Sequence, residues 1–315
     1  MSSDIQWFPG HMKKAMRLLE DQVKMVDIIL ETADARIPFS SRNPELEPII
    51  RVKPRLLILN KSDLADPAVT SAWISHYKKK GIPSVTSDAA GKKGLSQIRE
   101  LSKDLCSDVL NRAHAKGRMG RPIRAMVVGI PNSGKSTLIN SLSHRKSVVT
   151  ADRPGVTRGF QWVRSDSEME LMDMPGVLWP KIHSKRSQTC LAITGAIRSE
   201  VVDMPSLAFE GIRLLLSLYP DFFYSRYKLD PQDFYLPDDI EGDIAGLSDV
   251  SCSPDNIPEH NVDIGKIYEA AARACGCLMS GGRVDEERFA KQFVDDFRSG
   301  RMGRISLESP KAIEG

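Results

Sequence analysis

The stretch GIPNSGKST, residues 129–137, restricts the possible fold more than any other part of this chain. It matches the pattern G-x-x-x-x-G-K-[ST], it follows the apolar run AMVVG, and it leads into STLINSLS, which has helical character. The backbone N–H groups of such a loop, with the N-terminus of the following helix, form a phosphate-binding site. The motif therefore predicts an α/β domain in which a strand, this loop and a helix follow one another.

The residue types in this loop suit a bound nucleotide. Lys135 is expected to reach the β- and γ-phosphates, and the hydroxyl group of Ser136 is expected to bind Mg²⁺. By itself, the loop does not separate ATPases, kinases and GTPases. The candidate nucleotide contacts in this stretch are Asn132, Ser133, Gly134, Lys135, Ser136 and Thr137.

A second phosphate-side motif, LMDMPG at residues 171–176, predicts a strand that ends in D-x-x-G. Asp173 at the carboxyl end of that strand would hold Mg²⁺ through water, and the backbone amide of Gly176 would bond a γ-phosphate oxygen. Between the two motifs, DRPGVTRG offers the hydroxyl group of Thr157, which would close on Mg²⁺ when the γ-phosphate is present. The alternative for Thr157 is an ordinary loop threonine.

The stretch LLILNKSDL, residues 56–64, favours guanine over adenine. A carboxylate accepts from both the N1–H and the exocyclic amino group of guanine, which adenine cannot offer, so Asp63 would select GTP. Asn60 and Lys61 would brace the pocket around the base, and the backbone amides of TSDA would meet the guanine O6. The expected base site contains Asn60, Lys61, Ser62, Asp63, Thr86, Ser87 and Asp88.

The order of these motifs is reversed, because in an ordinary guanine-nucleotide switch the phosphate loop precedes the base-reading stretch. From Val26 onward the runs VDIILETAD, RLLILNKSD, IPSVTSDA and AMVVGIPN alternate with helical stretches, which is typical of a parallel sheet covered by helices, and FQWVRSD with MELMDMP predicts a hairpin. A Ras-type sheet entered midway accommodates them all, with HAKGRMGRPIR joining the usual last helix to the usual first strand. We therefore expect a circularly permuted Ras-like P-loop GTPase domain over residues 1–180.

Helical patterns lie between the strands and dominate the rest of the chain. Within the first domain they are HMKKAMRLLEDQVK, PELEPIIR, DPAVTSAWISHYKKKG, LSQIRELSKDLCSDVLNRAHAKG and KSTLINSLS. After about Pro180 they are CLAITGAIRSEVV, SLAFEGIRLLLSLYP, IGKIYEAAARACGCL and DEERFAKQFVDDFRSG. A C-terminal all-α domain over residues 181–315 is predicted, with the acidic stretch 236–263 as a long loop.

Composition excludes several classes of protein. A chain of 315 residues with 41% hydrophobic residues can form two domain cores. The five cysteines lack the spacing of a zinc site, and AARACGCLM around Cys275 and Cys277 predicts a helix with a glycine cap rather than a metal site. No signal or transit pattern is present at the N-terminus, and no apolar run has the roughly 18 to 20 residues that span a bilayer. We expect a cytoplasmic protein with no membrane contact.

The charge of the chain permits an anionic partner without requiring one. The formal net charge is +3, and two local runs, HAKGRMGRPIR and RSGRMGR, are basic enough to contact RNA phosphates. The alternative is that the first run is a solvated linker and the second a loose tail.

With the motifs in this order, the chain resembles the circularly permuted GTPases of the ribosome biogenesis GTPase A family, including the mitochondrial ribosome-associated GTPase 1 branch. The resemblance covers nearly the whole chain through WFPGHMKKA, NKSD, GIPNSGKST, PGVTR, DMPG, AITGAIR and GCLMSGG. It implies a cytoplasmic GTPase that binds maturing large ribosomal subunits and their rRNA, partly through the C-terminal helical domain. A monomer is expected, without DNA or membrane partners.

Three residues bear on hydrolysis. Val177 stands where Ras-type enzymes place a water-positioning glutamine, as the family pattern of a hydrophobic residue implies, so intrinsic hydrolysis should be slow. His11 precedes a helix whose start should lie at the phosphate edge of the sheet, so it is a candidate to orient water, unless WFPGHM only packs or contacts RNA. Asn132 resembles the K⁺ ligand of cation-activated GTPases, where the cation offsets transition-state charge.

The sequence also permits two other functions. A metabolic enzyme such as a nucleotide kinase also uses a phosphate loop, although NKSD argues against it. A GTP-gated binding protein for another RNA or protein partner would need the same nucleotide motifs and little catalysis. For a ribosome assembly factor and for a GTP-gated binding protein alike, the DMPG motif runs directly into the helical domain. This continuity suggests that the nucleotide state controls that domain.

Overall fold

The computed structural model describes residues 9–143, 161–164, 168–179, 182, 184–234 and 262–314. For residues 9–15, 161, 164 and 314 only the backbone is described. The predicted acidic loop at 236–263 falls almost wholly outside the described residues. Thr157 and Cys252 also lie outside the described residues, as do residues 180 and 181, between which the domain boundary is predicted. The division into domains at that point stays a prediction.

The sheet has six strands in the order β3-β2-β1-β4-β6-β5. All neighbouring pairs are parallel except β5 with β6, which form the predicted antiparallel hairpin. Every residue of β1 is buried, as expected for a strand covered on both faces. The strands are β1 Ile28–Asp34, β2 Arg55–Asn60, β3 Ser84–Thr86, β4 Ile123–Gly129, β5 Gln161–Arg164 and β6 Met169–Asp173.

The strand order brings the separated motifs to one edge. β2 ends at Asn60, β4 ends at Gly129 and β6 ends at Asp173, and all three strands run in the same direction. From β1 the chain adds β2 and β3 on one side, whereas after β4 it adds β6 and β5 on the other. The order therefore reverses between β1 and β4, and ligands of open α/β sheets bind at the carboxyl ends of strands at such a point. The predicted permuted α/β domain is confirmed.

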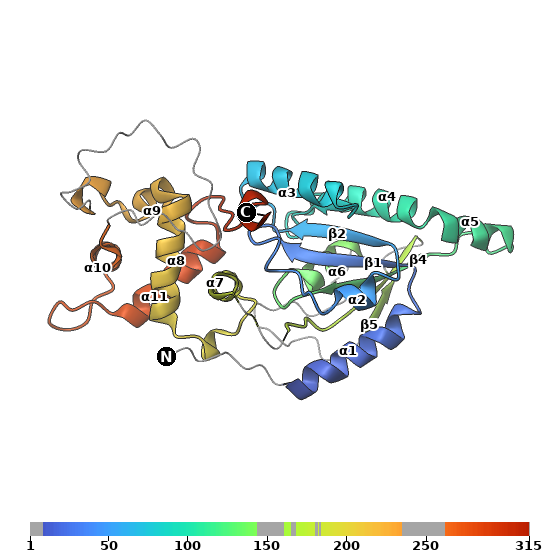
Figure 1. The fold of residues 1–315 in the computed structure, drawn as a ribbon, viewed down its shortest axis with the longest axis horizontal. Coiled ribbons are helices and arrows are strands. Elements are labelled where there is room, and N and C mark those ends of the chain that lie inside the picture. The colour runs from blue at the N-terminus through green and yellow to red at the C-terminus, as the bar shows by residue number, and fades with distance from the viewer. Residues whose placement is uncertain are drawn as a thin grey trace.

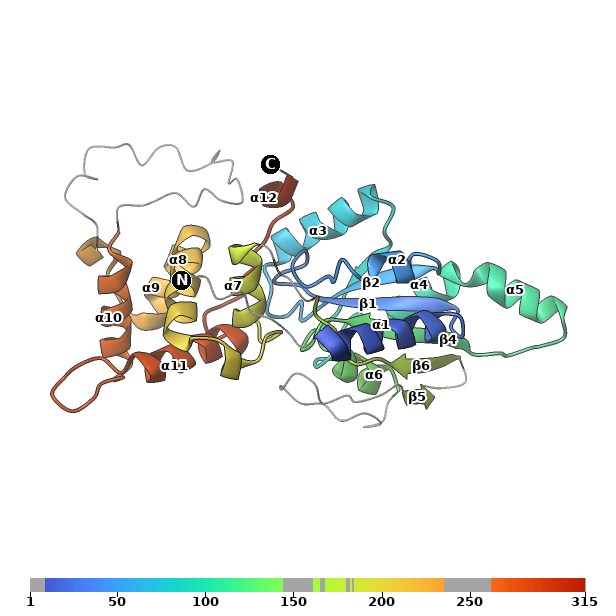
Figure 2. The ribbon, with the colours of Figure 1, turned by 60° about the horizontal axis from the view of Figure 1, so that its bottom comes forward.

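Helices cover both faces of the sheet (Figure 1, Figure 2). Leu19 of α1, Ile50 of α2 and Trp73 of α3 are buried on one face, in apolar clusters with alternate residues of the central strands. Ile98 of α4 and Leu138 of α6 are buried on the other face. The helices of this part are α1 Pro9–Val23, α2 Glu47–Ile50, α3 Pro67–Lys79, α4 Leu95–Leu105, α5 Ser107–Ala115 and α6 Lys135–Leu142.

Two helix predictions in this part need correction. The single helix expected over residues 95–117 is broken at the buried residue Cys106, which lies between α4 and α5. The helix α5 has no buried residue and extends beyond the sheet (Figure 1). The helix expected in PELEPIIR is only the single turn Glu47–Ile50, since two prolines in the stretch remove backbone donors.

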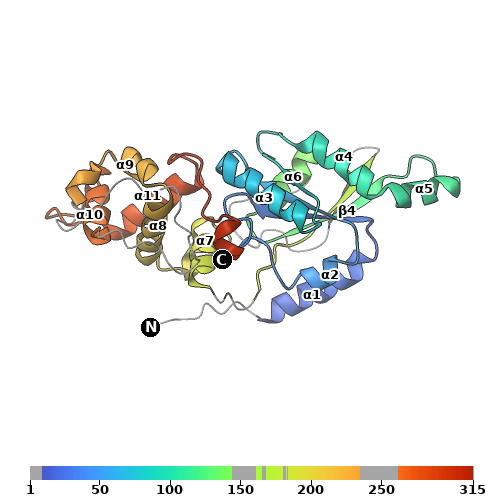
Figure 3. The ribbon, with the colours of Figure 1, turned by 45° about the horizontal axis from the view of Figure 1, so that its top comes forward.

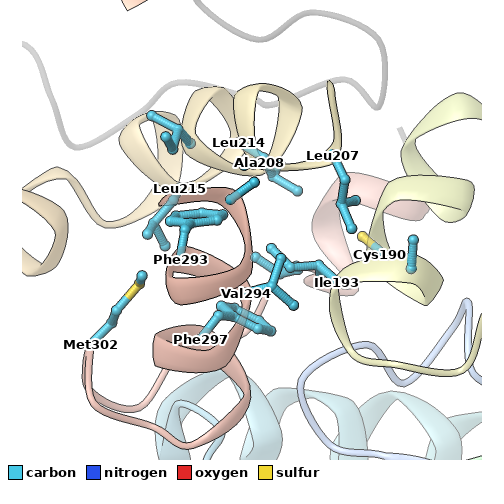
Figure 4. Packing of buried hydrophobic residues seen from close by; sticks show 14 of the residues in the cluster. Cys190, Ile193, Leu207, Ala208, Leu214, Leu215, Phe293, Val294, Phe297 and Met302 are labelled. Atoms are coloured by element: carbon cyan, nitrogen blue, oxygen red, sulfur yellow. The ribbon is translucent and has the colours of Figure 1, made fainter. Parts of the chain in front are cut away.

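The C-terminal part is helical, as predicted. Its core lies between α7, α8 and α11, where Ile193, Leu207 and Phe293 pack together (Figure 4). The corresponding elements are α7 Lys185–Ile193, η1 Ser199–Val201, α8 Met204–Leu218, α9 Pro220–Tyr227, η2 Pro231–Phe234, α10 Ile264–Ala274, α11 Glu286–Arg298 and α12 Lys311–Glu314.

The ends of these helices follow the chemistry of glycine. α10 is followed by Gly276 at φ +66°, which is the glycine cap predicted there. The helix expected over CLAITGAIRSEVV instead begins earlier and ends at Ile193, because Gly195 adopts φ +84° just beyond it. The helix α9 over PDFFYSRY was not predicted from the sequence.

The chain after α11 returns to the sheet instead of ending as a loose tail. The interpretation of RSGRMGR as a loose tail is therefore wrong. Residues 299–308, which we call the C-terminal strap, lead from α11 to α12, and α12 lies beside α3 (Figure 2, Figure 3). Ile305, Ser306, Leu307 and Glu308 are all at most 5% exposed. None of the described helices has the length and apolar character needed to cross a membrane.

Candidate nucleotide site

The loop between β4 and α6 has the backbone that a phosphate cradle requires. Asn132 and Gly134 adopt left-handed conformations, with φ +58° and +89°. A Cβ atom at Gly134 would overlap the Nδ2 atom of Asn60, so only glycine fits there. Ser136 and Thr137 follow Lys135 in the first turn of α6, where helix N–H groups lack intrahelical acceptors. The loop therefore lies between a strand and a helix, as predicted from the sequence, and its nucleotide contacts stay a prediction.

Lys135 is buried inside this loop. Its Nζ atom donates to the carbonyl oxygen of Ile130 at 2.7 Å. Burial lowers the pKa of the Lys135 amine to about 8, the charge of Asp173 acts in the opposite direction, and Lys61 adds to the lowering. A charged phosphate beside the amine would favour its protonated form.

The DMPG turn lies directly against the phosphate loop. A Cβ atom at Gly176 would lie 2.8 Å from Nζ of Lys135 and 2.7 Å from the backbone nitrogen of Pro131, so the close approach requires glycine. Asp173 has no exposed surface and pairs in the sheet with Val127 of β4. The two phosphate-side motifs therefore meet in space.

The residues present suit Mg²⁺. A serine hydroxyl and a carboxylate are the hard oxygen donors that Mg²⁺ prefers, and Mg²⁺ usually relies on phosphates and water for its other ligands. Ser136 lies in the first turn of α6, and Asp173 ends β6 beside the strand that leads into the loop. No group of three or more His, Cys, Asp or Glu side chains that could hold a metal alone occurs in the described part of the chain. The third expected ligand, Thr157, lies outside it.

Asn60 joins the phosphate loop to the base loops. Its Nδ2 atom donates to the carbonyl oxygen of Ser133 at 3.0 Å, and its Oδ1 atom accepts from the N–H of Ala89 at 3.2 Å. The side chain is 1% exposed, so both ends of the amide are satisfied inside the protein. The N–H of Ser62 also donates to the carbonyl oxygen of Ser87 at 3.1 Å. NKSD and TSDA thus form one structure around the expected guanine.

Lys61 is held by a pair of residues that sequence reasoning missed. Its Nζ atom lies 3.1 Å from Oδ2 of Asp34, and Arg36 donates to both carboxylate oxygens of Asp34 at 2.9 and 2.8 Å. Burial raises the pKa of Asp34, but the charges of Arg36 and Lys61 outweigh it and hold that pKa well below its usual range. The available signal was the sequence ADAR at the carboxyl end of a predicted strand.

The second base loop is rigidly closed on itself. Oδ1 of Asp88 accepts from the N–H of Gly91 at 2.7 Å, and the hydroxyl of Ser87 donates to Lys93. A Cβ atom at Gly94 would overlap the carbonyl oxygen of Thr86, which fixes the turn. The N–H groups of Ser87, Asp88 and Ala89 donate to protein acceptors. The expected contact of these amides with the guanine O6 stays a prediction, as do the roles of Thr86, Ser87 and Asp88.

Val177 belongs to the apolar core. It is 5% exposed and packs in the cluster that contains Leu19 of α1 and Met174. Its carbonyl oxygen accepts from Nδ2 of Asn43 at 3.0 Å. A side chain in this position has no group that orients water, so the glutamine role of Ras-type enzymes must be supplied by another residue or by a partner.

Asn132 connects the phosphate loop to the helical part. Its Nδ2 atom donates to the carbonyl oxygen of Gly195 at 2.7 Å. Arg298 of α11 holds the same segment through the carbonyl oxygens of Ala192 and Ile193, both at 2.9 Å. The expected role of Asn132 as a K⁺ ligand stays a prediction, and this contact gives the residue a second, structural task.

His11 lies near the beginning of α1, which starts on the side of the sheet where the parallel strands end (Figure 1). The backbone position is the one expected from the antiparallel run of helix and strand. The position of the His11 side chain is outside the described structure, so its catalytic role stays a prediction.

Residues 124–211 match the family model described as "50S ribosome-binding GTPase". The chain is 42% identical to the ribosome biogenesis GTPase A of Priestia megaterium over 311 residues, covering 98% of both chains. The chain belongs to the ribosome biogenesis GTPase A family. It is therefore a GTP-hydrolysing enzyme, and the nucleotide kinase alternative is excluded.

More distant relatives support the same fold. The mouse mitochondrial ribosome-associated GTPase 1 is 36% identical, and the match covers 96% of this chain and 90% of the relative. Among solved structures, GNP-bound YlqF from T. maritima superimposes with a TM-score of 0.60 at 24% identity, covering 95% of this chain and 99% of that one. A GDP-bound YlqF structure matches with the same TM-score.

The lowered pKa of Lys135 makes nucleotide binding dependent on pH. Burial lowers the pKa of the Lys135 amine to about 8 in the free protein, and a bound phosphate would raise it, so binding should take up protons at pH 8. Affinity for GDP should therefore fall as the pH rises above 8. Calorimetry of GDP binding at pH 8, in two buffers of different ionisation enthalpy, measures the uptake.

The control for this measurement is Lys135→Arg, since a guanidinium does not titrate in this range. The variant should take up fewer protons than the wild type. Equal heats in the two buffers for the wild-type protein would contradict the assigned state of Lys135.

Proposed function

We propose that this GTPase is an assembly factor for the large ribosomal subunit, and that it binds the precursor subunit and its rRNA in the GTP state and leaves after hydrolysis. The name of its 42% identical relative, ribosome biogenesis GTPase A, and the description "50S ribosome-binding GTPase" support this partner. A cytoplasmic location and a monomeric state are part of the proposal. A GTP-gated role with another RNA or protein is the alternative.

The single observation that carries the proposal is the bond from the Asn132 side chain to Gly195. It places the helical part in direct contact with the loop expected to bind phosphates. A change in that loop between GTP and GDP would move the acceptor on the helical part, which is the part expected to contact rRNA. The DMPG turn, through Gly176, approaches the same loop and leads by sequence into α7.

In the proposed reaction, Lys135 binds the β- and γ-phosphates and the first turn of α6 supplies N–H groups. Ser136, Asp173 and Thr157 would hold Mg²⁺, and the bound ion would supply neutralisation of phosphate charge. Asp63 binds the guanine edge, while Asn60 and Lys61 hold the surrounding loops. Since the Val177 side chain has no group that orients water, another group must orient the hydrolytic water, and the candidates in this proposal are His11 and a group of the bound ribosomal particle.

Co-sedimentation with purified ribosomal subunits tests the proposed partner. We expect the protein to pellet with large subunits or their precursors in a non-hydrolysable GTP analogue, and to stay largely in the supernatant in GDP. Small subunits are the matched control and should not retain it. Retention that is the same in both nucleotides, or that occurs with small subunits alone, would contradict the proposal.

His11→Ala tests the source of the water-orienting group. The variant should keep the GTP affinity of the wild type, because the base and phosphate loops are built from other residues. Its ribosome-stimulated turnover should fall by at least about tenfold, as expected when a general acid–base group is lost. Single-turnover GTP hydrolysis with saturating large subunits measures this. Unchanged stimulated turnover would remove His11 from the mechanism.

A monovalent cation at Asn132 is a further part of the proposal. K⁺ bound by its Oδ1 atom would offset transition-state charge in place of an arginine. Turnover in KCl should then exceed turnover in NaCl at equal ionic strength. Equal rates in the two salts would remove the K⁺ role of Asn132 from the proposal.

A further inference from the structure

The C-terminal strap lies along the loop that contains Asp63. The guanidinium group of Arg304 donates to two backbone carbonyl oxygens of this loop, from Nη2 to Ser62 at 2.7 Å and from Nε to Ala65 at 2.9 Å. The N–H of the next strap residue, Ile305, donates to the carbonyl oxygen of Leu64 at 3.0 Å. Residues on both sides of Asp63 are thus bonded to the strap.

The end of the same loop is fixed at Asp66. The N–H of Asp66 donates to the hydroxyl of Ser306 at 3.1 Å, and the hydroxyl of Tyr219 donates to Oδ2 of Asp66 at 3.2 Å. Tyr219 in turn accepts from the N–H of Ser306 at 3.3 Å. Because Asp66 also caps α3 by accepting from Ala68 at 2.8 Å, the loop ends in a rigid helix.

The strap is itself firmly anchored beyond Ser306. Glu308 accepts from the N–H groups of Phe39 at 2.8 Å and Ser40 at 3.1 Å, and its carbonyl oxygen accepts from Nε1 of Trp73 at 3.0 Å. Burial raises the pKa of the Glu308 carboxyl, and the hydrogen bonds from Ser40 and Phe39 oppose the rise. The strap therefore presents Arg304 from a fixed backbone.

A second connection reaches the loop from α11. The guanidinium of Arg36 lies 5.1 Å from the ring centroid of Phe297, at the end of α11. Arg36 holds Asp34, and Asp34 holds Lys61 at 3.1 Å. Lys61 precedes Asp63 by two residues, so the helical part constrains the base loop from its other side as well.

We infer that Arg304 is a positioning residue for guanine recognition, which holds the Ser62 and Ala65 carbonyls so that the exposed carboxylate of Asp63 faces the base. The inference rests on the proposed role of Asp63 as the base reader. Arg304 touches neither base nor phosphate in this scheme. Its loss should therefore weaken discrimination at the guanine edge more than it weakens phosphate binding.

Inosine triphosphate separates these two effects. It lacks the exocyclic amino group of guanine, so Asp63 can make only one of its two bonds to it. Arg304→Ala should reduce the preference for GTP over inosine triphosphate by about tenfold, the size expected when charge-assisted hydrogen bonds that place the carboxylate are lost. Displacement of a fluorescent GDP by each triphosphate gives the affinities of the folded protein for GTP and for inosine triphosphate.

Two further variants control the experiment. Arg304→Lys keeps the charge and one donor direction, and should give a preference between those of the wild type and Arg304→Ala. Lys311→Ala removes the same charge from an exposed site in α12 and should keep the wild-type preference. Urea unfolding of each variant verifies that the protein is folded under the conditions of the binding measurement. If Arg304→Ala does not fold, the preference of Arg304→Lys is used in its place.

The outcomes separate this inference from the proposed base site. If the wild type does not prefer GTP to inosine triphosphate, the assignment of Asp63 fails, and the role of Arg304 fails with it. If the wild type prefers GTP and Arg304→Ala keeps that preference, or loses affinity for both triphosphates by the same factor, the strap only stabilises the fold and the inference is wrong. A reduced preference in Arg304→Ala, with Lys311→Ala unchanged, supports it.

Discussion

The nucleotide site depends on the side chain of Asn60. This buried amide comes from the end of β2 and bonds the phosphate loop through Ser133 and the second base loop through Ala89. Position 134 requires glycine, because its backbone is left-handed and because any Cβ atom there would overlap the Asn60 amide. The expected base-reading loops and the phosphate loop, which are far apart in the sequence, are thus joined in one structure, whatever the order in which the chain supplies them.

The strands and the phosphate-side motifs could be predicted from the sequence because their signals are local. Short apolar runs that end in polar loops gave all six strands, and G-x-x-x-x-G-K-S with D-M-P-G fixed which strand ends must meet. The permutation followed from the order of the motifs alone. The helix break at Cys106 and the early end of α7 at Ile193 had weaker signals, since burial and a left-handed glycine decide them.

The contacts between the two parts of the chain could not be predicted, because no local pattern encodes a partner. RSGRMGR has the charge of a solvated tail, yet Arg298 and Arg304 donate to backbone carbonyls and the following residues are buried. Asp34 ends β1 and Arg36 follows it, and no local pattern in the sequence indicates that Asp34 pairs with Lys61 or that Arg36 holds Asp34. Asn132 likewise reaches Gly195 across the interface. These contacts tie the helical part to both the phosphate and the base loops.

The affinity of Asn60→Ala for GDP is the most direct test of this account. The change removes both bonds between the two loops, and we expect GDP affinity to fall by at least about tenfold, the effect of losing one to two buried hydrogen bonds. Asn43→Ala is the matched control, since Asn43 is also a buried asparagine but bonds Val177 instead of either loop, and it should bind GDP nearly as the wild type does. Equal GDP affinities for Asn60→Ala and Asn43→Ala would contradict the claim that Asn60 makes the separated motifs into one site.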